Sequence, residues 1–188
     1  MIPVLETERL RLRPFTLADA ARVEELASDR RIAATTLQIP HPYPKGEAAE
    51  WISAHRQLVV KGNLYTFAMT TKRENTCIGA ITLRVNKQHQ RAEIGYWLGV
   101  PYWGCGYTSE AAKRLVVYGF EELELNRIYA SIMVKNEASR KVLIKSGLLA
   151  EGVLPKHIKK WGVFEDVEVF GLTREEYARN KGYGANTK

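Results

Sequence analysis

Two glycines, Gly104 and Gly106, lie near the end of the charge-free stretch 94–109 and directly ahead of a segment with helical periodicity. Glycine allows the backbone to curl tightly, and the first N–H groups of a helix have no partner within that helix. A curl of this kind binds phosphate oxygens, with help from the helix dipole. The loop is therefore a candidate anion-binding site, and it comprises Trp103, Gly104, Cys105, Gly106, Tyr107 and Thr108.

Two common nucleotide-binding motifs do not fit this loop. A dinucleotide-binding fingerprint requires a third glycine where Ser109 stands and a parallel sheet from the start of the chain. A Walker loop requires Gly-Lys-Ser/Thr at its end, and this loop does not have it. We do not interpret Cys105 as a nucleophile because no histidine is close to it in sequence. The four histidines are too dispersed for metal-ligand spacing, so we expect no metal site.

Three polar residues outside the loop are further candidates. Glu93 stands just before the charge-free stretch, and its carboxylate could act as a general base. Alternatively, Glu93 is an exposed strand residue that pairs with Arg91 or Lys87. Asn136 belongs to a residue type that caps helices, and Ser139 follows it by three positions.

The pattern of apolar residues predicts the elements that position these groups. Strict alternation over 9–13 is typical of a half-exposed strand, and Thr16 with Asp19 predicts a helix start. Further strands are expected at 64–71, 77–85, 91–100, 127–134, 149–159 and 164–173, and further helices at 47–60, 109–123 and 136–146.

The connections between these elements predict the fold class. Short links between the second, third and fourth strands indicate an antiparallel meander. A helix separates strand 91–100 from strand 127–134, which indicates a parallel, right-handed crossover. We therefore predict an α+β fold: a mixed, mostly antiparallel sheet of about seven strands, with one parallel crossover at the fourth and fifth strands, flanked by helices. A sheet can splay where the pairing changes in this way.

Composition narrows the functional class. The chain has 188 residues, a formal charge of +7 and 45% hydrophobic residues, which predicts one globular domain over 1–178 and a frayed tail over 179–188. Two cysteines and the lack of a secretory signal favour a cytoplasmic location. The charge-free run is shorter than the roughly 20 residues of a membrane helix, so no membrane partner is expected. Lysines and arginines are scattered, which argues against a specific nucleic-acid motif but leaves a contact with the acidic ribosome open.

Taken in order along the chain, these segments resemble the GNAT superfamily of N-acetyltransferases. Within it they are most similar to the branch that acetylates the N-termini of ribosomal proteins. The resemblance covers nearly the whole chain and rests on the succession of its motifs: 7–14 (TERLRLRP), 93–98 (EIGYWL), 103–111 (WGCGYTSEA), Asn136 with Ser139, and Gly147. The chain departs from the family where Trp103 replaces Gln or Arg, where Cys105 replaces a frequent basic residue, and where Thr108 replaces Gly or Ala.

The resemblance implies acetyl-CoA as co-substrate and assigns roles to the candidate residues. The loop 103–108 would hold the pyrophosphate, and the backbone of Trp97, Leu98 and Gly99 would pair with the pantetheine arm, to which Asn136 would add a hydrogen bond. Glu93 would act as general base. Many members place a tyrosine where this chain has Leu143, so protonation of the departing thiolate falls to Ser139 or to water.

The expected activity is the transfer of acetyl to a primary amine. A protein N-terminus is favoured as acceptor, because an amine of pKa near 8 loses its proton more easily than a lysine near 10.4. A small amine or an antibiotic is the alternative acceptor. The alternative from another class is a non-catalytic module that binds CoA or the ribosome.

Overall fold

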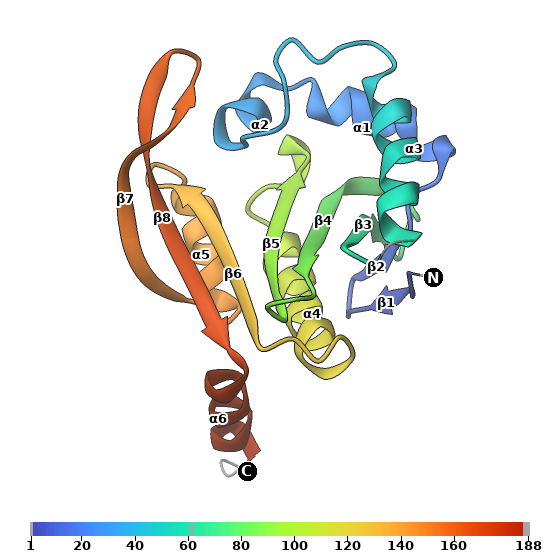
Figure 1. Cartoon of the computed structure of the whole chain (residues 1–188). Helices are drawn as coiled ribbons and strands as arrows, with labels where there is room; N and C mark the ends of the chain where they lie inside the picture. The colour runs from blue at the N-terminus through green and yellow to red at the C-terminus, as the bar shows by residue number, and fades with distance from the viewer. Residues whose placement is uncertain (1, 61, 186–188) are drawn as a thin grey trace.

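The computed structural model describes residues 2–60 and 62–185, which form one mixed sheet with helices on both faces (Figure 1). The sheet has eight strands in the order β1-β2-β3-β4-β5-β6-β8-β7. The strands are β1 (Leu5–Glu6), β2 (Leu10–Arg13), β3 (Leu64–Thr71), β4 (Cys77–Asn86), β5 (Arg91–Leu98), β6 (Arg127–Met133), β7 (Leu149–Lys160) and β8 (Val163–Thr173). Neighbouring strands are antiparallel except β5 and β6, which are parallel. The predicted α+β class and the crossover between the fourth and fifth predicted strands are confirmed.

Six α-helices flank this sheet: α1 (Ala20–Ala27), α2 (Arg30–Thr35), α3 (Glu47–Val60), α4 (Tyr107–Glu121), α5 (Glu137–Lys145) and α6 (Arg174–Ala185). The bounds predicted for α3 agree with the structure. The predicted helix start at Thr16 is also present, where the carboxylate of Asp19 accepts a hydrogen bond from the Thr16 amide at 2.8 Å. Within the described ranges, no helix combines the length and apolarity that crossing a membrane requires.

Several boundaries differ from the sequence-based expectation. Strand β5 ends at Leu98 instead of residue 100, because Val100–Tyr102 form a 3-10 turn that contains Pro101. Helix α4 begins two residues early, directly after Gly106. Strand β1 and helices α2 and α6 were not predicted. Residues 179–185, expected to be frayed, continue helix α6, and residues 186–188 lie outside the described residues.

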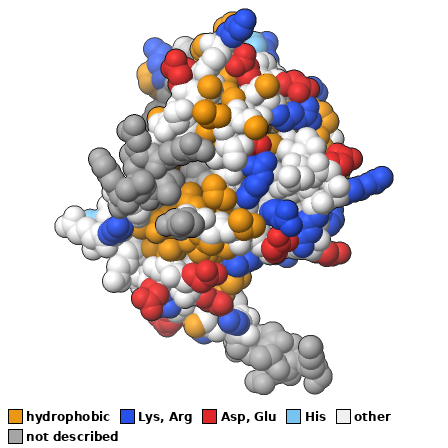
Figure 2. Space-filling view, turned by 90° about the vertical axis from the view of Figure 1, so that its right-hand side faces the viewer, with side chains coloured by type: hydrophobic (Ala, Val, Ile, Leu, Met, Phe, Trp, Pro, Cys, Tyr) orange, Lys and Arg blue, Asp and Glu red, His pale blue; other side chains and the backbone are white. Residues whose placement is uncertain are grey.

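The apolar residues of the sheet are buried on both of its faces. On one face, α4 buries Ala112 and Leu115 against a core that also contains Phe67 and Ile81 of the sheet. On the other face, Phe15, Ile52 and Ala80 belong to a smaller cluster under α1 and α3. The side of the molecule on which α3 lies shows hydrophobic side chains near its middle and lysine or arginine toward one edge (Figure 2). Helices thus cover both faces of the sheet.

Candidate active site

Strands β5 and β6 form a fork. They pair at only three positions, from Arg91 opposite Arg127 to Glu93 opposite Tyr129. Beyond these positions both strands continue, to Leu98 and Met133, but they diverge toward the top of Figure 1. The splay expected where the pairing changes is therefore present, and among the described residues no strand lies between the two open edges.

The β5 edge of the fork presents alternate backbone groups to the gap. The Gly99 amide donates to the Ile78 carbonyl of β4 at 2.8 Å, which directs it away from the gap. Because an antiparallel ladder alternates, the amide of Trp97 also faces β4, whereas the backbone groups of Tyr96 and Leu98 face the gap. Of the three residues expected to pair with the pantetheine arm, Leu98 is the one so oriented. Its carbonyl also accepts a hydrogen bond from the indole Nε1 of Trp103 at 2.7 Å.

The glycine loop lies past the end of β5 and leads into α4. Gly104 and Gly106 have φ values of +77° and +80°, which residues with a Cβ rarely adopt. A Cβ built on Gly104 has no neighbour within 4 Å, so the loop curls around open space. The side chains of Trp103 and Cys105 are exposed, whereas Thr108 is buried. The first N–H groups of α4 follow directly on this loop, and such groups have no partner within their own helix.

An N-terminal clamp holds this loop; its members are Thr7, Arg9 and Glu110. The Glu110 carboxylate accepts hydrogen bonds from the Thr7 hydroxyl at 2.6 Å, from the Arg9 amide at 2.8 Å and from Arg9 Nε at 2.7 Å. Arg9 Nη1 also donates to the carbonyl of Cys105 at 3.0 Å, inside the loop. Burial disfavours the charged carboxylate, but the hydrogen bonds from Thr7 and Arg9 outweigh it and lower the pKa of Glu110. None of these residues was predicted to support the loop, because about a hundred positions separate Thr7 and Arg9 from Glu110.

We expect Glu110→Gln to lower the free energy of unfolding by about 1–2 kcal/mol at pH 7, because it replaces a charged hydrogen-bond acceptor with a neutral one. The effect is no larger because the site is partly exposed to solvent. The native pKa is lower than the ordinary value of 4.5, so the carboxylate contributes fully above that value. Its contribution is lost as the pH falls through the lowered native pKa. Urea unfolding of both proteins between pH 3 and pH 7 should show a difference that is largest at neutral pH and shrinks in acid. A difference that does not change with pH would contradict the charge-based account of the clamp.

Glu93 lies at the point where the fork opens, on the face of the sheet that carries α1 and α3. Its carboxylate is paired with Arg84 Nη1 at 3.5 Å, and its side chain is 33% exposed. The expected alternative partners, Arg91 and Lys87, are thus replaced by the residue directly opposite on β4. Two residues further along the strand, on the same face, Gly95 is exposed, and a Cβ there would meet nothing within 4 Å. The sheet is therefore open to a ligand beside Glu93.

Asn136 and Ser139 lie at the start of α5, on the opposite face. Asn136 Oδ1 accepts a hydrogen bond from the Ser139 amide at 3.1 Å, which confirms the predicted cap. Asn136 Nδ2 also donates to the Thr35 carbonyl at 3.3 Å, so this side chain links α5 to α2. Leu143, at the position where relatives place tyrosine, is fully buried in the core.

A tyrosine to which the sequence assigned no separate role is hydrogen-bonded to Ser139. The hydroxyl of Tyr96, on β5, lies 2.7 Å from Ser139 Oγ. Burial raises the pKa of Tyr96 well above its usual range, so the phenol stays protonated at neutral pH. The hydroxyls of Tyr96 and Ser139 thus connect the β5 strand to the start of α5, next to the fork.

The two cysteines differ in access. Cys105 is exposed in the loop, whereas Cys77 is buried in β4, where burial raises its pKa to about 11. We expect an alkylating reagent to label Cys105 faster than Cys77, and saturating acetyl-CoA to protect Cys105 more than adenine nucleotides without the pantetheine arm do. Mass spectrometry of labelled peptides over time would measure both rates. Equal labelling of Cys105 with and without acetyl-CoA would place the phosphates elsewhere.

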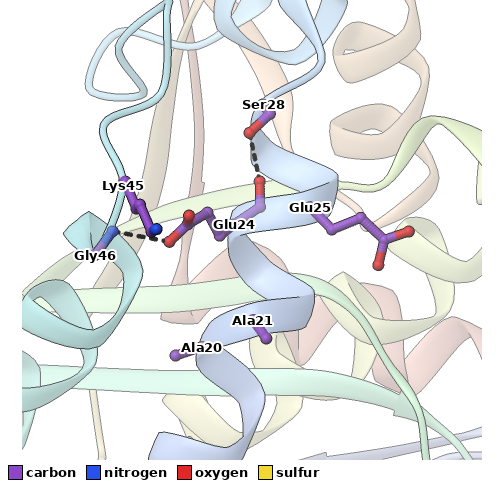
Figure 3. Close-up of a pocket in the computed structure, with 7 residues that line it drawn as sticks. All are labelled: Ala20, Ala21, Glu24, Glu25, Ser28, Lys45 and Gly46. Carbon is purple, nitrogen blue, oxygen red and sulfur yellow. Dashed lines mark hydrogen bonds between the residues drawn. The ribbon is translucent and has the colours of Figure 1, made fainter.

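Two hollows lie away from these residues. One, of about 580 Å³, is lined by α1 and the segment that leads into α3, where Glu24 accepts a hydrogen bond from the Gly46 amide at 2.9 Å (Figure 3). The other, of about 530 Å³, lies between α4 and α6. Neither is lined by a residue of the loop, the fork or the start of α5. Among the described residues, no three His, Cys, Asp or Glu side chains lie close enough together to hold a metal ion.

Comparison with known proteins agrees with this geometry. Residues 9–149 match the family model of an acetyltransferase (GNAT) domain. The chain is 35% identical to N-acetyltransferase p20 of Bacillus licheniformis, over 93% of this chain and 98% of that protein, and 30% identical to the ribosomal-protein-serine acetyltransferase of Escherichia coli, over 52% and 55%. The structure of RimL, a ribosomal L7/L12 alpha-N-protein acetyltransferase in complex with coenzyme A, has the same fold, with a TM-score of 0.84 at 17% identity over 91% of this chain and 98% of that one. The chain belongs to the GNAT family and is an N-acetyltransferase.

Proposed function

We propose that this protein transfers acetyl from acetyl-CoA to the N-terminal amine of a protein. The observation that carries the proposal is the fork: an unpaired edge of β5 leads from Glu93 to a glycine loop at the start of a helix. A linear molecule with a polar arm and a pyrophosphate matches this path, because the strand edge offers hydrogen bonds and the helix start attracts anions. The backbone of Tyr96 and Leu98 would hold the arm, and the loop 103–108 would hold the phosphates.

In this proposal, Glu93 takes the proton. It accepts a proton from the acceptor ammonium, directly or through water, and the neutral nitrogen then attacks the thioester carbonyl carbon. A C–N bond forms, the C–S bond breaks, and the sulfur leaves as thiolate. The nitrogen loses its second proton to water as the amide forms, while Ser139, with Tyr96 behind it, donates a proton to the sulfur and regains one from water. The 2.7 Å contact between these hydroxyls supports this role.

The choice of a protein N-terminus rests on three supports. An N-terminal amine has a pKa near 8 and needs little help to lose its proton at neutral pH. The ribosomal-protein-serine acetyltransferase of Escherichia coli is a sequence relative, although its match spans about half of each chain. The polar face beside Gly95 is also open, which suits the end of a polypeptide.

One assay tests the proposal against its alternatives. Purified protein and acetyl-CoA are incubated with mixed ribosomal proteins, with polyamines and with aminoglycosides, while released free thiol is measured. Thiol release with ribosomal proteins, together with acetylated N-termini found by mass spectrometry, is the expected result. Release with the small amines alone would show a small-molecule enzyme. Acetyl-CoA binding without release in any mixture would show a non-catalytic module.

The open space beside Gly95 gives a more local prediction. We expect Gly95→Val to raise the acceptor KM roughly tenfold or more, a loss of about 1.4 kcal/mol, because the new side chain fills the space beside Glu93 into which the acceptor amine must fit. Valine favours strands, so the melting temperature should not fall. Initial rates against acceptor concentration, with a melting curve, would check this. An unchanged KM would mean that the acceptor amine does not bind beside Gly95.

A further inference from the structure

The charges around Glu93 are unequal. Over β3, β4, β5 and β6 the sequence contains one carboxylate, Glu93, and three cations: Arg84, Arg91 and Arg127. Arg127 is neutralised by an ion pair with Glu151. Among the described residues, no carboxylate is within ion-pair distance of Arg91, whose guanidinium instead lies 5.6 Å from the centre of the Tyr129 ring. These four strands together thus carry more positive than negative side chains.

The two remaining arginines lie where the body of an acceptor would extend. Arg91 begins β5 and is two positions before Glu93, so both side chains are on the same face of the strand. The cofactor loop follows the other end of β5, so Glu93 lies between the loop and Arg91. Arg84 is opposite Glu93 on β4 and its side chain is 53% exposed. An acceptor whose amine reaches Glu93 therefore has its next groups beside Arg91 and Arg84.

Four carboxylates on β8, α1 and the start of α2 are already paired with cations. On β8, Glu165 is paired with Lys135, and the buried Glu168 is paired with Arg140. On α1 and at the start of α2, Glu25 pairs with Arg22 and Asp29 pairs with Arg31. The segment 36–46, which connects α2 to α3, contains no acidic residue. A second ammonium on the acceptor would meet the cations Arg91 and Arg84 beside Glu93.

We infer, on the basis of the proposed function, that the preferred acceptor is an N-terminus followed by acidic residues, whose carboxylates pair with Arg91 and Arg84. Arginine binds carboxylates through two parallel hydrogen bonds, which gives such a pair geometric selectivity. The 3.5 Å contact between Arg84 and Glu93 is longer than a normal hydrogen bond, so an acceptor carboxylate can replace Glu93 as the partner of Arg84. This exchange leaves Glu93 free to take the proton. Polyamines and basic N-termini are disfavoured by the same arginines.

The test uses two peptides of equal length that begin with serine and differ in charge. One carries Asp and Glu at positions two to four, and the other carries Lys and Arg there. We expect kcat/KM to be roughly tenfold or more higher for the acidic peptide, with a preference that shrinks as salt rises. Arg91→Glu should abolish or reverse the preference. Arg73→Glu, a charge reversal in the exposed turn between β3 and β4, is the matched control and should preserve it.

The outcomes separate this inference from the proposed function. If both peptides are acetylated at equal rates and Arg91→Glu changes nothing, charge selection is wrong and N-terminal acetylation stands. A preference for the basic peptide also overturns the inference. If neither peptide is acetylated while spermidine is, the proposed function itself is wrong. Melting curves of the variants show whether a lost preference reflects a lost fold.

Discussion

Glu93→Gln should lower turnover by roughly 10²- to 10⁴-fold, because glutamine keeps the shape of the side chain but cannot accept the proton. Acetyl-CoA binding should barely change, since the carboxylate lies beyond the loop and the β5 edge on which the cofactor is proposed to bind. The loss should shrink as the pH rises, because a growing fraction of the acceptor amine is then neutral without a base. The measurements are steady-state rates from pH 6 to pH 9.5 and the Kd of acetyl-CoA by calorimetry.

The matched control for this change is Glu74→Gln. Glu74 is exposed in the turn between β3 and β4, so the same chemical change there should leave turnover unaltered. A Glu93→Gln protein with wild-type turnover at neutral pH would remove Glu93 from the mechanism. A uniform loss at every pH would assign Glu93 to acceptor positioning instead of proton transfer.

Gly106→Val should weaken acetyl-CoA binding by roughly 100-fold or more, or about 2.7 kcal/mol. The residue has a φ of +80° at the start of α4, and a β-branched side chain is strained in that conformation. The new Cβ would also lie 3.6 Å from Arg9 Nη2, so its methyl groups would press on the guanidinium that holds the loop. Calorimetric binding of acetyl-CoA, with melting curves of the protein without ligand, would measure both effects.

Gly162→Val separates strain from function. Gly162 has a φ of +86° in the β7–β8 turn, and a Cβ there would meet nothing within 4 Å. The substitution Gly162→Val therefore introduces similar backbone strain at a position away from the loop. We expect it to lower the melting temperature about as much as Gly106→Val does, but to leave acetyl-CoA affinity intact. If the two variants lose affinity equally, the loop contributes to folding only.

The parts of the molecule that sequence predicted are those with local signals. Short polar links marked the antiparallel meander, and the crossover helix marked the parallel pair, so the fork itself was expected. The glycine loop, Glu93 and the Asn136 cap were recognisable because residue type and local position define them. Whether Glu93 and the loop perform the assigned chemistry stays a prediction.

The parts that were missed depend on contacts between distant segments. Helix α2 has six residues, too few to show periodicity, and it is held by bonds from Asn136 to Thr35 and from Lys160 to Thr36. The bond between Tyr96 and Ser139 spans 43 positions, and that between Thr7 and Glu110 spans 103. Such pairs leave no repeating pattern in a single sequence. The contact of Tyr96 with Ser139 and the support of the loop by the N-terminal clamp could therefore be recognised only in the folded chain.

The fork also has a thermodynamic consequence. Three residue pairs join β5 to β6, so the ladder of backbone hydrogen bonds that connects the two halves of the sheet is short. A ligand whose arm lies along β5 adds to that ladder and binds the folded state alone. Its binding then raises stability in proportion to the logarithm of its concentration once the site is saturated. The resistance of this protein to unfolding and proteolysis is thereby coupled to the supply of acetyl-CoA around it.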